Sequence, residues 1–155
     1  MKKHLLLIVM LLATLSVRSQ ALLFETFSEG IPASWTLFND NNTTHNPAYS
    51  DAWAWTRYIG NPAPGIASTS WFDPAGNEAD RWIVTAPVFI PDSGYSFALD
   101  ASSVEEVYAD GFEVRISTTG CANRNQFGSP LMSQSQCEDA YCEFVASLDD
   151  YVGDT

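Results

Sequence analysis

Residues 112–117 read FEVRIS, and this stretch decides the fold class. Phe112, Val114 and Ile116 alternate with polar residues, and a period of two is that of a β-strand with one face buried and the other in water. The same alternation recurs in YSFALD at 95–100. Both segments are therefore predicted to be half-buried strands.

Strand-like segments continue on both sides of this stretch and are separated by clusters of Gly, Pro, Asn and Asp that are typical of turns. No window after residue 19 shows apolar residues at helical spacing over a useful length. The sequence predicts an all-β fold, a jelly-roll-like antiparallel β-sandwich forming one domain over residues 20–155. The further expected strands are 22–27, 35–38, 52–57, 66–71, 82–90 with a bend at Pro87, and 142–147.

The first 19 residues have the order of a secretory signal peptide. Lys2 and Lys3 precede the apolar run Leu5–Leu15, and small polar residues follow before Gln20. The apolar run is too short to span a bilayer as a permanent helix. We expect cleavage near Ser19 and export to the cell surface or the medium, with an uncleaved signal anchor as the alternative.

The charge balance after residue 19 is strongly acidic. Four arginines and no lysine face all 19 carboxylates, which gives a formal net charge of −15. This charge repels phosphate backbones and anionic lipid, so nucleic-acid partners and membrane insertion after signal cleavage are not expected. It suits divalent cations, and it also suits solubility alone.

Four segments occur in an order that is similar to a known pattern. A first strand leads through a Gly-x-Pro turn to Trp35, an acidic-Arg-Trp block precedes Pro87, a strand ends in Ser-Thr-Thr-Gly, and a Leu-x-x-Tyr-x-Gly segment follows; they are 24–35, 80–87, 112–120 and 147–154. Together they resemble the cleaved-adhesin (choice-of-anchor J) domains of Bacteroidetes surface proteins.

This resemblance implies a jelly-roll sandwich, calcium in its loops, and a module of a longer exported protein that adheres to host proteins or polysaccharides. The chain departs from the family in two places. The family continues with further strands where this chain stops at Thr155, so we expect the last strands to be missing. The cysteine-bearing segment 120–142 is not part of the family pattern and is expected to be an inserted loop.

Two loops concentrate the oxygen ligands that calcium prefers, Asn39–Thr44 and Asp73–Asp80. Ordinary Asx-turns explain such loops equally well. The family resemblance and the net charge favour calcium, to which Glu25 on the first strand adds a further carboxylate. The candidate metal ligands are Glu25, Asn39, Asp40, Asn42, Asn77 and Asp80.

Tryptophans offer a second kind of candidate site. Trp53 and Trp55 are two residues apart and so face the same side of a strand, with Trp71 nearby. Such aromatic surfaces stack on sugar rings, and Trp53, Trp55 and Trp71 are the candidate ligand-binding residues. Core packing is the alternative interpretation, because one face of each sheet must be buried.

The three cysteines of an exported chain favour a disulfide over a metal or redox site. Cys137 and Cys142 are too close for a comfortable bridge if both lie in one extended strand. We therefore expect Cys121 to pair with Cys137 or Cys142, leaving one thiol over.

Catalytic constellations are weak in this sequence. His45 is the only histidine after residue 19, no Ser-containing nucleophile elbow occurs, and abundant carboxylates do not by themselves define a catalytic pair. The expected function is a non-catalytic, secreted or cell-surface adhesion module that binds a host extracellular protein or glycan. The alternatives are a carbohydrate-binding module attached to a hydrolase, a two-carboxylate glycoside hydrolase fragment, and a structural spacer.

Overall fold

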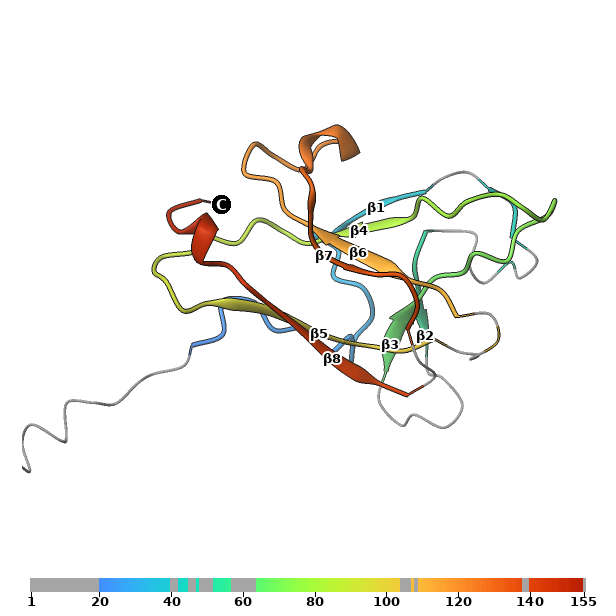
Figure 1. Ribbon diagram of the computed structural model, residues 1–155, viewed down its shortest axis with the longest axis horizontal. Coiled ribbons are helices and arrows are strands. Elements are labelled where there is room, and N and C mark those ends of the chain that lie inside the picture. Colours follow the sequence, from blue (N-terminus) through green and yellow to red (C-terminus); the bar gives the residue numbers. More distant parts are fainter. Residues whose placement is uncertain are drawn as a thin grey trace, which may run out of the picture.

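The computed structural model describes residues 20–39, 42–44, 47, 52–56, 64–103, 107, 109–137 and 140–154. The predicted signal peptide lies outside these residues. The described parts form eight strands and two 3₁₀ turns and contain no α-helix (Figure 1). The elements are β1 Thr36–Phe38, β2 Ala54–Thr56, β3 Gly65–Ala67, β4 Trp82–Val84, β5 Ser96–Ala101, β6 Phe112–Arg115, η3 Arg124–Gln126, β7 Pro130–Gln134, β8 Cys142–Ser147 and η4 Asp149–Tyr151.

The strands pair in four antiparallel ladders, β1 with β4, β2 with β3, β5 with β8, and β6 with β7. The β5–β8 and β6–β7 pairs lie in opposite layers (Figure 1). Phe112 of β6 and Phe144 of β8 meet edge to face between the layers, with ring centroids 5.0 Å apart. The predicted all-β antiparallel sandwich is confirmed. Among the described residues, no helix has the length and apolar character needed to cross a membrane.

In the β5–β8 ladder, the alternation of apolar and polar residues in the sequence matches an alternation of half-buried and exposed side chains. Phe97 and Leu99 of β5 are half-buried while their neighbours Ser96 and Asp100 are exposed. Leu99 is paired with Phe144, which is half-buried on β8. The period of two therefore identified both the strands and the faces that turn inward.

The described core is small and brings distant segments together. Phe72 and Ala52 are 1% exposed, and Val84, Ile90 and Cys137 are also buried. The guanidinium of Arg81 lies over the Phe72 ring, 4.9 Å from its centroid. This stacking covers the aromatic face with a cation that stays at the surface.

Three expected strands differ from the structure, and one of them, 66–71, is observed as β3 and ends at Ala67. Residues 22–27 are not a strand, Phe24 is 79% exposed, and Phe27 has a positive φ of 56° that interrupts extended backbone. The expected strand 82–90 ends at Val84, since Pro87 has no backbone N–H to donate to a ladder.

Strand β7 was not predicted. It begins at Pro130 and carries the adjacent apolar residues Leu131 and Met132, so it lacks the alternation that marks a half-buried strand. It pairs antiparallel with β6, with one shift of register between Val114 and Arg115, and this pairing turns the expected inserted loop into a hairpin.

The last described segment is tied to the sandwich by backbone hydrogen bonds. The Leu148 amide donates to the Tyr95 carbonyl at 2.9 Å, and the Gly153 amide donates to the Ile90 carbonyl at 2.8 Å. The Gly94 amide also donates to the Asp149 carboxylate at 2.6 Å. These contacts fix η4 beside the β4–β5 connection.

Candidate functional site

The two oxygen-rich loops predicted from the sequence meet in the structure. The Asp73 amide donates to the Thr43 carbonyl at 2.8 Å, and Thr44 and Phe72 form an isolated antiparallel bridge. The Asn42 side-chain amide also donates to the Glu78 carbonyl at 3.1 Å. The loops are therefore one region of the surface rather than two independent sites.

Polar groups in this region already have protein partners. The Asp80 carboxylate accepts from Arg124 and from the Trp82 indole N–H, the latter at 2.5 Å. The Asn77 amide donates to the Pro74 carbonyl at 3.3 Å, which is the local turn that the alternative interpretation expected.

These contacts bear on the calcium prediction. The described residues contain no group of three or more Asp, Glu, His or Cys side chains placed to hold a metal ion. Asn39 directly follows β1, and Asp40 lies outside the described residues. Calcium binding by these loops stays a prediction, with Asp40 among its expected ligands.

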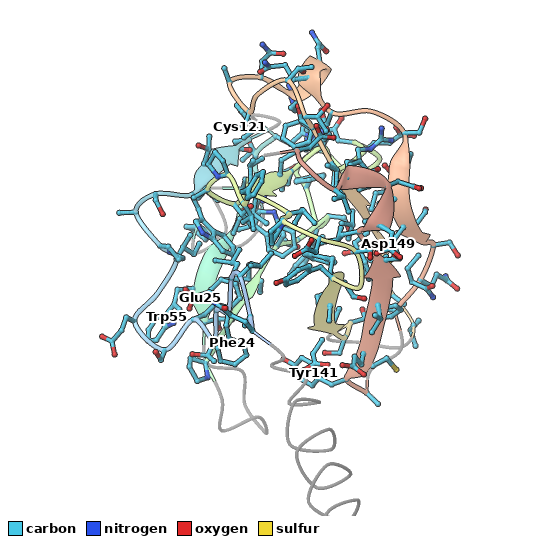
Figure 2. The ribbon with its side chains drawn as sticks, turned by 90° about the vertical axis from the view of Figure 1, so that its left-hand side faces the viewer. Phe24, Glu25, Trp55, Cys121, Tyr141 and Asp149 are labelled. Atoms are coloured by element: carbon cyan, nitrogen blue, oxygen red, sulfur yellow. The ribbon has the colours of Figure 1, made fainter. Side chains whose placement is uncertain are left out.

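Glu25 serves a local turn. Its carboxylate accepts from the Phe27 amide at 2.5 Å, next to the positive φ of Phe27. Figure 2 shows Glu25 at the same edge of the molecule as Phe24 and Trp55. This position gives Glu25 a role in shaping the N-terminal turn.

The three candidate tryptophans have different environments. Trp53 is half-buried and its indole N–H donates to the Arg81 carbonyl at 3.4 Å, so the core interpretation fits it. Trp55 is 45% exposed and its indole N–H donates to the Phe27 carbonyl at 2.6 Å. Trp71 is 66% exposed. Trp55 and Trp71 thus remain surface candidates.

Phe24 is a surface aromatic that sequence reasoning missed. The sequence predicts a strand there, in which an apolar residue would point inward, but the segment is irregular and the ring is exposed at the edge of the molecule where Figure 2 also labels Trp55. The positive φ of Phe27 carries no signal in the sequence, because Gly and Asn are the usual residues in that conformation.

The expected disulfide from Cys121 is not formed, and all three cysteines are free thiols. Cys121 follows β6, whereas Cys137 follows β7 and donates its amide to the Asp110 carbonyl before β6 at 2.9 Å. Cys137 thus lies next to the start of β6 and Cys121 follows its end. The four residues of β6, at about 3.3 Å each, separate these two ends by more than the Cα–Cα distance of a disulfide. Figure 2 places Cys121 at the end opposite Tyr141, the neighbour of Cys142.

Cys137 is protected rather than reactive. Its burial, followed by the nearby Cys142 thiol and the Asp110 carboxylate, raises the pKa of Cys137 above its ordinary value. A raised pKa keeps the thiol protonated at neutral pH, and the thiol is a poor nucleophile compared with the thiolate. Cys137 is therefore a core residue.

The β6–β7 connection is ordered and packs on the acidic-Arg-Trp block. Asn123 and Gln126 form a capping box around η3. Phe127 packs against Trp82 with ring centroids 5.3 Å apart, and Arg124 pairs with Asp80. The segment that departs from the family pattern is therefore integrated into the fold.

Comparison with solved structures shows which fold this is. The chain is similar to the K3 cleaved adhesin domain of Lys-gingipain from Porphyromonas gingivalis W83, with a TM-score of 0.63 and 22% sequence identity over 82% of this chain and 80% of that domain. No protein-family model and no curated protein sequence matches the chain. The expected cleaved-adhesin-like fold is supported by this likeness.

Proposed function

We propose that the chain is an extracellular adhesion module that binds a host protein or glycan and has no catalytic activity of its own. The observation that carries the proposal is the exposure of large aromatic side chains, Phe24, Trp55 and Trp71, on an otherwise acidic exported domain. Exposed tryptophans are favoured anchors at binding surfaces, since they bury a large rigid area when a partner docks.

The cleaved-adhesin-like fold supports this proposal, because the similar domain is the K3 cleaved adhesin domain of Lys-gingipain. Attachment to further domains of a longer exported protein is part of the same proposal. The fold alone admits many functions, so the aromatic surface has to be tested directly.

The rival hydrolase interpretation loses part of its support. Asp110 accepts a hydrogen bond from Ser70 at 2.7 Å, and Glu113 is paired with Arg115 at 2.6 Å. These two carboxylates are thus engaged in local contacts, whereas a glycosidase needs a facing pair across the scissile bond.

Calcium belongs to the proposal as a stabilising ion rather than a reactant. What supports it is that the loops at 42–44 and 72–78 are hydrogen-bonded together and are rich in oxygen atoms. An ion there would add to the order that Arg81 and Arg124 already give these loops through the Asn42 carbonyl and the Asp80 carboxylate.

The test is binding of the purified protein to immobilised host matrix proteins and to a glycan array. Trp71→Ala and Phe24→Ala are expected to weaken binding by about tenfold each, the effect of losing about 1.4 kcal/mol at an anchor residue. Phe89→Ala is the matched control, since Phe89 is also an exposed aromatic residue, at 54%, and is not one of the proposed anchors. Binding that survives both anchor substitutions would refute the aromatic surface, and turnover of glycosides would refute the non-catalytic part.

A further inference from the structure

The structure also has a concave surface that the exposed tryptophans do not line. It is a cavity of about 480 Å³ between the β6–β7 connection and η4. Figure 1 shows these two elements on the same side of the molecule, the connection in orange and η4 in red. Its volume falls within the range of small-molecule sites, which is about 300–1,000 Å³.

The lining of this cavity differs from the rest of the surface. No charged side chain lines it, although 19 carboxylates occur in the chain. Hydroxyl and amide groups dominate, accompanied by the apolar side chains of Ile116, Pro130 and Leu131. The polar lining residues are Ser117, Thr118, Thr119, Gln126, Ser129 and Tyr151.

Some of these polar groups are committed and others are available. The Gln126 amide donates to the Thr119 carbonyl at 3.3 Å and accepts from the Asn123 amide at 3.0 Å, so it shapes the wall. The hydroxyls of Thr118, Ser129 and Tyr151 have no protein partner within the described part of the chain. Three hydroxyls, two from the opposite ends of the β6–β7 connection and one from η4, thus line one cavity with their hydrogen-bonding capacity unused.

The position of the cavity is fixed by the fold. Tyr151 is held by η4, which the Asp149 and Leu148 contacts tie to the β4–β5 connection. The opposite wall is held by the Gly128 amide, which donates to the Ile116 carbonyl at 3.3 Å, and by Arg115, which donates to the Gly128 carbonyl at 2.6 Å. Both walls are therefore built before a ligand arrives.

We propose that this cavity binds one uncharged pyranose unit of a glycan. A sugar ring offers hydroxyls that donate and accept, which match Thr118, Ser129 and Tyr151, and apolar C–H faces that match the Tyr151 ring and Leu131. An anionic ligand would need a cationic side chain, and a metal ion would need carboxylates, and the lining has neither. The inference rests on the proposed function and names the glycan site within it.

The experiment is an NMR-detected titration of the purified protein with neutral methyl hexosides, with glucuronate and a hexose phosphate as charged probes. Saturable shifts are expected at 117–119, 129–131 and 151 with neutral hexosides alone. Thr118→Val removes one hydroxyl at nearly constant shape and should weaken binding about two- to tenfold, whereas Thr118→Ser keeps the hydroxyl and should bind as the wild type does. Tyr151→Phe should weaken binding to a similar extent.

The outcomes separate this proposal from the wider one. No saturable shift in the cavity with any neutral hexoside, equal binding of glucuronate, or unchanged binding by Thr118→Val would overturn the cavity site. Loss of hexoside binding in Trp71→Ala, with no effect of Tyr151→Phe, would also overturn it while leaving the adhesion function in place. If the wild type binds neither hexosides nor the host panel, both proposals fail.

Discussion

The β6–β7 connection is held on the sandwich mainly by aromatic packing, and this can be tested with two substitutions. Phe127→Ala removes the ring that packs 5.3 Å from Trp82, and Arg124→Ala removes the ion pair with Asp80. Both side chains project from the same short segment, so comparing the stability of the two variants shows which contact anchors that segment.

The magnitudes follow from burial. Phe127 is half-buried, so its truncation loses about half of the 1.5–3 kcal/mol of a fully buried aromatic, together with about 0.5–1.5 kcal/mol for the ring pair. We expect about 1.3–3 kcal/mol in total. The Arg124 and Asp80 side chains are 39% and 57% exposed, and an exposed ion pair contributes about 0.2–1 kcal/mol. For a domain of this size, 1 kcal/mol is about 3 °C in melting temperature.

The assay is thermal unfolding followed by tryptophan fluorescence at low and at about 1 M salt, where the Debye length shrinks to about 3 Å. The cost of Arg124→Ala should disappear at high salt, whereas that of Phe127→Ala should persist. Phe89→Ala, an exposed aromatic elsewhere, should change stability by less than about 0.5 kcal/mol. A cost of Arg124→Ala equal to or above that of Phe127→Ala at physiological salt would refute this reasoning.

Three further predictions follow from the thiols and the loops. Burial raises the pKa of Cys137, so at alkaline pH the reduced folded protein keeps the Cys137 proton while the unfolded chain loses it. The free energy of unfolding should therefore fall as pH rises past the ordinary thiol pKa of 9.0, and Cys137→Ala should remove this part of the decline. Peptide mapping of exported protein should find Cys121 as a free thiol, and a disulfide-linked Cys121 peptide would contradict the hairpin geometry. Calcium at about a hundredfold excess over Kd should add about 2.7 kcal/mol to the stability, with a smaller gain in Asp40→Ala, whereas equal shifts with magnesium at matched ionic strength would exclude a calcium site.

The strands that sequence reasoning predicted are those with one wet and one dry face. The stretches around Phe112, Phe97 and Phe144 alternate between apolar and polar residues because each of their sheets is covered on one side only. The sequence pattern therefore predicts both the strand and its buried face. Strand β7 was not predicted because it begins with Pro130 and its adjacent apolar residues Leu131 and Met132 do not alternate with polar ones. Residues 22–27 show the reverse error, since an apolar run without a partner strand stays irregular.

For the candidate site, the sequence predicted the chemistry of individual residues but not the contacts between distant segments. That the two oxygen-rich loops share one region could not be read from the sequence, because the Thr43–Asp73 contact joins residues 30 positions apart. Asp80 had the right chemistry for calcium, but its pairing with Arg124 depends on how the β6–β7 hairpin folds back, which no local pattern encodes. The same fold-back separates Cys121 from Cys137 and brings Thr118 and Ser129 to one cavity.

The β6–β7 hairpin therefore contacts both the acidic loop region around Asp80 and the uncharged cavity beside Tyr151. Its outer end supplies the cation that neutralises Asp80, and its base supplies the hydroxyls that line the cavity beside Tyr151. Since Arg124 and Arg115 both lie on this hairpin, two of the four arginines after residue 19 act within a few residues of the cavity. Arg115 bonds Glu113 and the Gly128 carbonyl, so these cations are used to order the hairpin rather than to attract an anionic ligand. An uncharged cavity on an acidic domain is the result, which favours neutral partners over charged ones at this face.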